Sequence, residues 1–241
     1  MEYAVKTRSK EIGNCESLQS PCAKIKIQTL DIKSGVSDPT AVNIELDIEK
    51  EILLIEGEEA SKAKNIDELV DLLVEEYKNL ISDIKDYNLP WEIMYMLDVV
   101  NNGRGLLSVV INSYSYRGGA HGISFIRYLN YNLYNGNRIT LDSAFVNDVD
   151  FVKLCEKSFR LQYGIDERAD INEVRFNFPD NRFYIPDNFI FERDYVVFKY
   201  NVYEIAPYSE GVIEFKIDLE SLRPFIKSDV LKAFISEVAS I

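Results

Sequence analysis

The chain has little of the chemistry that most catalytic and metal-binding sites require. Its 241 residues include one histidine, His121, and three cysteines, Cys15, Cys22 and Cys155. A zinc site needs histidine and cysteine ligands at short paired spacings, which these four residues do not provide. Ser-His-Asp catalysis needs a serine on a strained elbow, and the sequence contains no G-x-S-x-G motif. The residues by themselves therefore specify no reaction, and we predict no catalytic residues, no metal and no cofactor.

Basic residues are also scarce relative to acidic ones. There are 27 lysines and arginines against 40 aspartates and glutamates, which gives a formal net charge of −13. Nucleic acid and anionic membrane surfaces both attract positively charged proteins, so this balance argues against either partner. An acidic surface attracts cationic partners, but it can also serve only to keep a protein soluble. Both interpretations stay open on the sequence alone.

Long apolar runs are missing as well. No run approaches the roughly 20 apolar residues of a membrane-spanning helix, so we expect no transmembrane segment. The start, MEYAVKTRSKEIGNC, lacks the apolar core of a signal peptide. The protein is therefore either cytoplasmic or an exported protein whose export signal has been removed. Cys15 and Cys22 are close enough in sequence to pair, whereas Cys155 sits in a helical pattern and is predicted to be a buried hydrophobic residue.

What the chain does have is clear hydrophobic periodicity. Residues 23–33 alternate between apolar and polar side chains, as a half-buried strand does. Asn65 and Glu68 form a capping-box pattern before an apolar stripe, which predicts a helix that runs to about residue 86. Further helices are predicted over 41–54, 148–163, 219–226 and 229–239. Further strands are predicted over 91–100, 106–116, 123–134, 138–141, 189–191, 195–200 and 212–218, with a long connection over 164–188.

Helices and strands occur in separate blocks, and short turns join the four strands between residues 91 and 141. This order predicts an α+β fold in which antiparallel β-meander sheets pack against amphipathic helices. We expect an irregular N-terminal arm over 1–22, a part over 23–146 that contains the central meander, and a C-terminal α+β part over 147–241. The last two parts are expected to pack as one compact unit.

The central meander contains the segment Arg-Gly-Gly-Ala-His-Gly at 117–122, which we call the glycine loop. It holds three of the eleven glycines and the single histidine. A phosphate-binding loop would need a helix after it, but a strand is predicted there. The glycine loop is therefore either a wide hairpin turn whose glycines take positive φ angles, or a loop that faces a ligand or a partner. In the first case His121 has a structural role.

Tyrosine is abundant, with fifteen residues, and many of them fall in predicted strands. Side chains two residues apart on a strand point to the same face, so Tyr114 and Tyr116 should lie together. Tyrosine is enriched at protein interfaces, and it is also a common residue of ordinary sheets. The sequence is compatible with both roles.

Two stretches of the chain together resemble a known family. The first is Tyr-Ser-Tyr-Arg-Gly-Gly-Ala-His-Gly at 114–122, with Tyr-Asn-Leu-Tyr-Asn-Gly at 131–136 and Leu-Asp-Ser-Ala-Phe at 141–145. The second is Tyr-Glu-Ile-Ala-Pro-Tyr-Ser-Glu-Gly at 203–211. They resemble the extracytoplasmic domain of unknown function found in RsiV-type anti-sigma factors and beside the catalytic domain of PdaC-type peptidoglycan deacetylases. Residues 23–55 resemble the small companion domain that precedes it, so the resemblance covers about 23–226.

The resemblance implies an exported and non-catalytic domain, which in the anti-sigma factors binds lysozyme as a sensor. Lysozyme is strongly basic, and a charge of −13 suits such a partner. We expect this chain to lack the sigma-binding segment, the membrane span and the deacetylase domain of those proteins. Sensing and deacetylation are therefore not carried over to it.

We therefore predict a cell-envelope binding module, in the periplasm or at the cell surface, that recognises lysozyme, another basic protein or a cell-wall glycan. The residues expected to contact the partner are Tyr116, Gly118, Gly119, His121, Tyr203, Glu204 and Tyr208. Two alternatives remain open. One is an enzyme that acts on envelope polysaccharide with His121 and a carboxylate as acid and base, and the other is a purely structural lipoprotein domain.

Overall fold

A computed structural model describes residues 1–16, 21–57, 60, 62–103, 105–173 and 175–230. The chain forms two compact units. Unit 1 comprises Met1–Asp98 and Val110–Arg127, and unit 2 comprises Val99–Val109 and Tyr128–Ile241. The boundaries between the units fall within three strands rather than in a linker, and they differ from the predicted division after residue 146.

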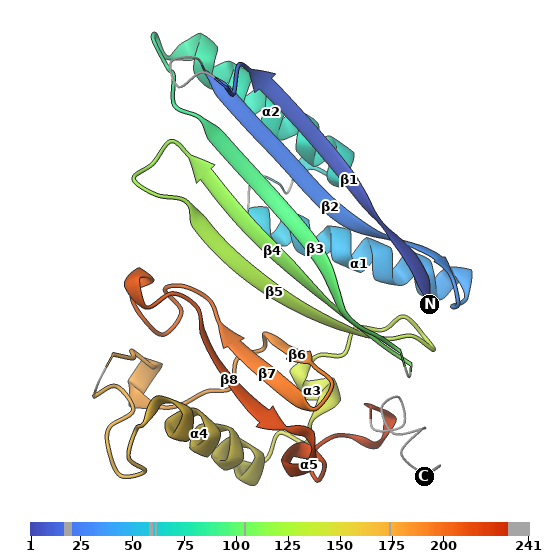
Figure 1. The fold of residues 1–241 in the computed structure, drawn as a ribbon, viewed down its shortest axis with the longest axis vertical. Coiled ribbons are helices and arrows are strands. Elements are labelled where there is room, and N and C mark those ends of the chain that lie inside the picture. The colour runs from blue at the N-terminus through green and yellow to red at the C-terminus, as the bar shows by residue number, and fades with distance from the viewer. Residues whose placement is uncertain (17–20, 58–59, 61, 104, 174, 231–241) are drawn as a thin grey trace. The chain divides into compact units, whose positions relative to one another are not determined.

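Five strands form one mixed sheet in the order β1-β2-β3-β4-β5 (Figure 1). β1 and β2 are antiparallel, whereas β2 and β3 are parallel because two helices connect them. β3, β4 and β5 are neighbours in the sheet and in the sequence, which confirms these three strands of the central meander. The α+β class is therefore confirmed. The bounds are β1 Glu2–Gly13, β2 Cys22–Ser34, β3 Trp91–Gly103, β4 Leu106–Arg117 and β5 Ile123–Asn132.

The prediction of an irregular arm over 1–22 is wrong, because Glu2–Gly13 forms β1. β1 pairs with β2 along its whole length, and Cys15 and Cys22 form a disulfide at the end of this hairpin. None of its twelve residues is buried, so β1 lacks the apolar and polar alternation that identifies a half-buried strand. Backbone pairing and the disulfide hold β1 in the sheet, and neither leaves a periodic pattern in the sequence.

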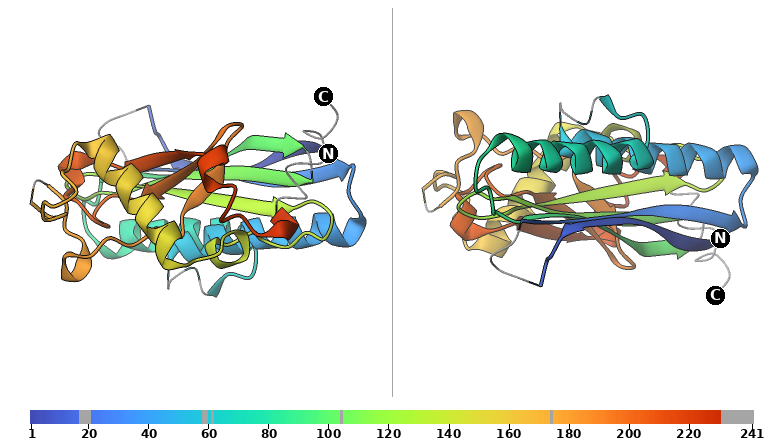
Figure 2. Two further views of the ribbon diagram at one scale, coloured as in Figure 1. Left: turned by 90° about the horizontal axis from the view of Figure 1, so that it is seen from below. Right: turned by 90° about the horizontal axis from the view of Figure 1, so that it is seen from above.

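Helices α1 (Asp38–Glu56) and α2 (Ile66–Asp83) cover one face of the sheet in unit 1 (Figure 2). Both were predicted. α2 buries its apolar stripe, whereas α1 buries Ile44, Ile48 and Ile52 and leaves Val42, Leu46 and Leu54 exposed. Asn65 caps α2 as predicted, because its side-chain oxygen accepts a hydrogen bond from the backbone N–H of Glu68 at 2.9 Å. The Glu68 carboxylate accepts a hydrogen bond from the backbone N–H of Lys64 at 2.8 Å, so a second backbone donor at this helix end is satisfied.

The fourth strand of the predicted meander, 138–141, does not form. Tyr131 and Arg138 make only an isolated bridge, and a short helix α3 (Leu141–Ala144) follows at once. Thr140 starts α3 with a capping box, since its side chain accepts from the N–H of Ser143 while the Ser143 hydroxyl accepts from the N–H of Thr140. The local capping chemistry therefore takes precedence over the β propensity of this stretch.

Unit 2 contains a second, antiparallel sheet in the order β6-β7-β8 and helix α4. These elements were predicted, as was the long connection between α4 and β6. The core is aromatic: the ring centroid of Phe159 on α4 lies 4.8 to 6.1 Å from six other aromatic rings. The bounds are α4 Val149–Tyr163, β6 Phe189–Phe191, β7 Tyr195–Tyr200, β8 Ile213–Asp218 and α5 Leu219–Leu222, with single 3-10 turns at Pro179–Asn181 and Tyr208–Glu210.

The predicted helix over 229–239 stays a prediction, because residues 231–241 lie outside the described residues. Cys155 is buried on α4, as predicted, and this burial raises the pKa of its thiol to about 12. Among the described residues, no helix combines the length and apolar character needed to cross a bilayer.

Candidate functional site

The glycine loop connects β4 to β5. At two of its glycines the neighbouring side chains leave no room for a Cβ atom. Gly118 has φ +81°, and a Cβ atom added to it would lie 2.8 Å from the Cβ of Leu89. Gly122 is buried, and a Cβ atom on it would lie 2.4 Å from ring atoms of Tyr114. Gly119 is exposed, with its nearest neighbour atom 3.9 Å from such a Cβ. Gly118 and Gly122 therefore shape the turn, whereas Gly119 is under no such constraint.

This difference gives a matched pair of substitutions. Gly118→Ala should lower the free energy of unfolding by about 1–2 kcal/mol, because alanine is strained at positive φ and its methyl group would collide with Leu89. Gly119→Ala should be neutral or slightly stabilising, since it restricts only the unfolded chain. Urea unfolding followed by tryptophan fluorescence measures both changes. Equal effects from the two substitutions would contradict this account of the loop.

Arg117, the last residue of β4, anchors the glycine loop to the helices. Its guanidinium is ion-paired with Glu56 at the end of α1, and one of its nitrogens lies 3.7 Å from the carboxylate of Glu76 on α2. The guanidinium carbon also lies 5.0 Å from the ring centroid of Trp91 on β3. The hydroxyl of Tyr95 donates a hydrogen bond to Glu56 at 2.5 Å. We call these five residues the Arg117 cluster.

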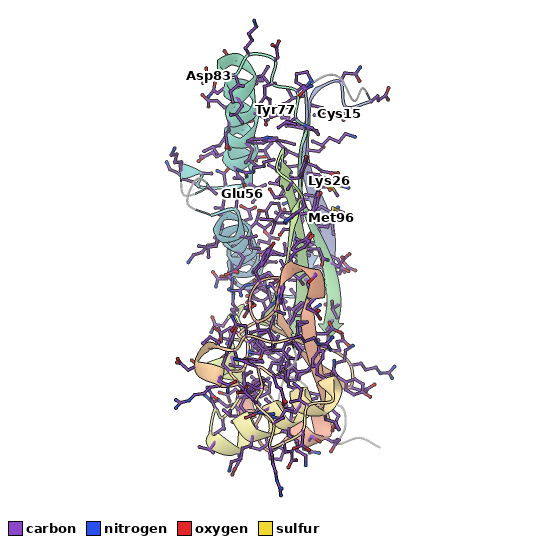
Figure 3. The ribbon with its side chains drawn as sticks, turned by 90° about the vertical axis from the view of Figure 1, so that its left-hand side faces the viewer. Cys15, Lys26, Glu56, Tyr77, Asp83 and Met96 are labelled. Carbon is purple, nitrogen blue, oxygen red and sulfur yellow. A yellow bond between two sulfur atoms is a disulfide. The ribbon has the colours of Figure 1, made fainter. Side chains whose placement is uncertain are left out.

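The Arg117 cluster is mostly shielded from solvent. The side chain of Glu56 is 4% exposed and that of Arg117 is 29% exposed, and Figure 3 labels Glu56 at the end of α1. Burial lowers the pKa of Arg117 and raises the pKa of Tyr95. An arginine remains charged after such a shift, so the buried carboxylate keeps its counter-ion. The arrangement joins four elements beneath the glycine loop.

A second ion pair holds the other strand of this hairpin to α1. The Nε of Arg127 on β5 donates to the carboxylate of Glu51 at 2.7 Å, and Glu51 is buried. Sequence reasoning missed both pairs, although a signal was present. Glu51 and Glu56 occupy positions of α1 that follow its apolar residues Ile48 and Ile52 at helical spacing. A charged residue at an apolar position indicates a buried partner.

His121 is exposed, and its Nδ1 lies 3.0 Å from the backbone oxygen of Gly122. Tyr116, on β4 next to Arg117, is half-buried and faces the opposite side of the strand. Within the part of the chain that the structure describes, no group of three histidine, cysteine or acidic residues is suited to hold a metal ion. The predicted site residues of unit 1 therefore lie in and next to a hairpin turn, which the ion pairs of Arg117 attach to α1 and α2.

The predicted site residues of unit 2 lie in the segment that follows β7. Tyr203 has φ +67°, a left-handed conformation that is uncommon for a tyrosine. The Glu204 carboxylate accepts hydrogen bonds from the backbone N–H of Asn201 at 2.8 Å and from the hydroxyl of Tyr184 at 3.2 Å. Ile205 is buried in the core of unit 2. These contacts fix the segment on both sides of the Tyr203 backbone.

The result is an exposed pair of aromatic rings. The ring centroids of Tyr203 and Tyr208 are 5.5 Å apart, and the two residues are 59% and 37% exposed. Glu204 lies next to Tyr203 in the chain, and Glu210, which is ion-paired with Arg175 at 3.2 Å, follows Tyr208. Exposed aromatic faces with carboxylates nearby can bind cations and the aliphatic parts of polar ligands. We call Tyr203, Tyr208 and Glu204 the tyrosine platform.

The structure thus brings together three of the predicted residues, Tyr203, Glu204 and Tyr208, in unit 2. The other four, Tyr116, Gly118, Gly119 and His121, belong to the glycine loop and the adjoining end of β4 in unit 1. That either set of residues binds a partner stays a prediction.

Two parts of this chain match the models of two known families. Residues 16–124 match the family described as "Deacetylase PdaC", and residues 145–220 match the family described as "Protein of unknown function (DUF3298)". A search of curated proteins finds no match. The resemblance to PdaC-type proteins is therefore confirmed, whereas the resemblance to RsiV-type anti-sigma factors stays a prediction.

Two solved structures share the fold over nearly the whole chain. One is a DUF3298 family member from Bacteroides fragilis, 20% identical, with a TM-score of 0.72 and coverage of 97% of this chain and 98% of the other. The second is a DUF3298 family protein from Pseudomonas aeruginosa, 19% identical, with a TM-score of 0.65 and coverage of 97% of both chains. At these identities the likeness establishes the fold.

Proposed function

We propose that this protein is a non-catalytic binding module of the cell envelope that recognises lysozyme or a peptidoglycan-related ligand through the tyrosine platform. The observation that carries the proposal is the exposed pair Tyr203 and Tyr208, whose ring centroids are 5.5 Å apart and whose first member has a backbone with positive φ. Residues held in sparsely populated backbone regions cluster at active sites and ligand contacts.

The chemistry of the tyrosine platform favours a basic partner. A guanidinium or ammonium group gains a cation–π contact over a tyrosine ring and an ionic contact with a carboxylate. The net charge of −13 attracts such a partner over a longer range and raises its association rate. Lysozyme and other basic proteins present these groups on their surfaces, whereas a neutral glycan would stack on the rings and donate hydroxyl hydrogen bonds without gaining the ionic attraction.

We propose an extracytoplasmic location, in the periplasm or at the cell surface. The disulfide between Cys15 and Cys22 supports this location, because disulfides persist in oxidising compartments. The match of residues 16–124 to the family described as "Deacetylase PdaC" supports it as well, because the resemblance to PdaC-type proteins implies an exported domain.

Calorimetric titration of the intact protein with lysozyme, and separately with muropeptides, tests the proposal. We expect lysozyme to bind, and we expect affinity to fall between 50 and 200 mM salt because the attraction between net charges is screened. Tyr203→Ala and Tyr208→Ala should each weaken binding by about tenfold or more, as truncation of an interface tyrosine commonly does. Binding of muropeptides alone would assign the platform to glycan.

The matched control is Tyr195→Ala, which removes another exposed tyrosine of unit 2 at the start of β7. This variant should bind like the unmodified protein. Absence of binding to both ligands at low and physiological salt would reject the proposal, and equal losses from all three tyrosine variants would reject the platform as its site.

A further inference from the structure

β1 forms one edge of the five-stranded sheet, and no described strand pairs with its outer side (Figure 1). On its inner side it pairs with β2 in regular antiparallel register from Tyr3 to Gly13. About half of the backbone N–H and C=O groups of such a strand point away from its neighbour. An edge of this kind is a template to which another strand can add.

β1 lacks most of the features that block such pairing. Natural edge strands are usually short, or carry prolines, bulges or charged side chains. β1 has twelve residues, about twice the usual length, and it contains no proline. Its register is irregular only between Glu2 and Tyr3. Charged side chains are therefore its remaining protection, and their sign determines which partners they exclude.

These charges are basic and lie on one face of the strand. Lys6, Arg8 and Lys10 are exposed and occupy alternate positions, so they project from the same side. Arg8 is ion-paired with Asp67 on α2, so this side is the helix-covered face of the sheet. Residues 1–34 contain six lysines and arginines and four acidic residues, whereas the whole chain has 27 and 40. We call Lys6, Arg8 and Lys10 the basic strip.

The basic strip already binds carboxylates of its own chain. The Nε of Arg8 donates to Asp67 at 2.5 Å, and the Nζ of Lys6 lies 3.3 Å from a carboxylate oxygen of Asp31. The side chains of Lys6 and Arg8 are 46% and 45% exposed. Exposed ion pairs contribute little to stability, so both cations can turn to the carboxylates of a partner while unit 1 stays folded.

The opposite face of β1 is uncharged over most of its length. Tyr3 and Val5 are 39% and 40% exposed there, and Thr7 and Ser9 follow them at alternate positions. Side chains that lie opposite each other on neighbouring strands interact in pairs. A strand added to β1 would therefore meet cations on one face and apolar or hydroxyl side chains on the other. Its best match is a segment in which acidic residues alternate with β-branched ones.

We infer that the outer edge of β1 binds an extended acidic segment of another protein, which adds to the sheet as a further strand. Backbone hydrogen bonds hold the segment, and its alternate carboxylates meet Lys6, Arg8 and Lys10. The surface belongs to unit 1, so it does not depend on the function proposed for the tyrosine platform.

Two electrostatic effects decide which partner fits. A second copy of this chain is disfavoured, because an antiparallel pair of β1 strands would place one basic strip against the other. The net charge of −13 repels an acidic segment at long range. At physiological salt the Debye length is about 8 Å, so direct contacts with the basic strip outweigh repulsion from more distant carboxylates.

Hydrogen exchange of the intact protein, resolved by residue with NMR, tests strand addition. The probe is an acetylated and amidated ten-residue peptide in which glutamate alternates with threonine and valine. At about ten times its Kd it should slow the exchange of alternate amides of β1 about tenfold, because only the outward N–H groups gain partners, and leave α4 unchanged. A matched peptide with lysine in place of glutamate should have no effect. Unprotected β1 amides, or equal protection by the lysine peptide, would overturn the inference.

A pair of charge-reversal variants tests the role of the basic strip. K6E/K10E should weaken binding of the fluorescein-labelled glutamate peptide by about tenfold or more, as measured by fluorescence anisotropy, because like charges then face each other. The matched control K78E/K85E changes the net charge equally at two exposed lysines of unit 1 away from β1. It should bind nearly as the unmodified protein does, and equal losses in the two variants would overturn the inference.

Sedimentation of the protein without peptide tests the alternative occupant. We expect a monomer at concentrations up to about 100 μM, since the basic strips of two copies repel each other. A dimer in which the same alternate amides of β1 are protected would overturn the inference and assign the edge to a second copy of this chain.

Discussion

Replacing Glu56 with alanine is expected to lower the free energy of unfolding of unit 1 by about 3 kcal/mol. The Glu56 side chain is 4% exposed, and it carries the ion pair with Arg117 and the hydrogen bond from Tyr95. Its removal leaves a largely buried guanidinium with Glu76 at 3.7 Å as a more distant carboxylate. Urea unfolding followed by the fluorescence of Trp91, which packs under Arg117, measures this loss.

Glu75→Ala is the matched control, because Glu75 is an exposed residue of α2 near the same cluster. It should change the free energy of unfolding by less than about 0.5 kcal/mol. The double variant E56M/R117M removes both charges. Its loss in the free energy of unfolding should be smaller, by about 1–3 kcal/mol, than the sum of the losses in E56M and R117M. Additive losses would contradict the view that the cost comes from an uncompensated buried charge.

Replacing Asn130 with alanine is expected to destabilise unit 2 by a similar amount. Asn130 is 1% exposed. Its amide donates to the backbone oxygen of Phe189 at 2.8 Å, and its carbonyl accepts from the Ser108 hydroxyl at 2.8 Å and from the backbone N–H of Phe191 at 3.3 Å. Alanine leaves these buried groups without partners, at about 1–3 kcal/mol for each one that finds no replacement. Chemical unfolding followed by far-UV circular dichroism measures the change.

A second substitution at this position adds a pH dependence with a definite sign. N130D puts a carboxyl opposite the Phe189 oxygen, and burial raises the folded-state pKa of that carboxyl above its unfolded value. The variant should therefore be more stable at pH 4, where the neutral acid can donate, and lose stability as the pH rises toward 7. Asn177→Ala, at an exposed position, should be near neutral. Two results would contradict this role of the Asn130 hydrogen bonds. One is a stability of N130D that does not change with pH, and the other is an Asn130→Ala variant as stable as Asn177→Ala.

Local patterns identified most of the elements of this fold. The apolar stripes of α1, α2 and α4 recur at helical spacing, and the predicted helices are present. β2 was identified because its buried residues alternate with exposed ones. β1 was missed because its pairing with β2 leaves both of its faces exposed. The strand expected over 138–141 failed because the capping box at Thr140 favours a helix start.

The candidate site was predictable in part. The segment that contains Tyr203, Glu204 and Tyr208 was identified through its resemblance to a family, and the structure adds that the two rings are exposed and lie together. The Arg117 cluster was not predicted. Its carboxylates come from α1 and α2, and its arginine comes from β4, so no spacing within one element joins them.

The sequence by itself determined the class of fold, the positions of the helices and most strands, and the shortage of metal-binding and nucleophilic chemistry. These properties follow from local periodicity and composition, which neighbouring residues carry. Only the tertiary structure decided that β1 completes the sheet, that Arg117 meets Glu56, and that Tyr203 and Tyr208 share one exposed patch. Each of these features depends on the pairing of distant segments or on the direction of a backbone turn. The sequence does not distinguish a charged or aromatic residue that faces water from one that contacts another side chain.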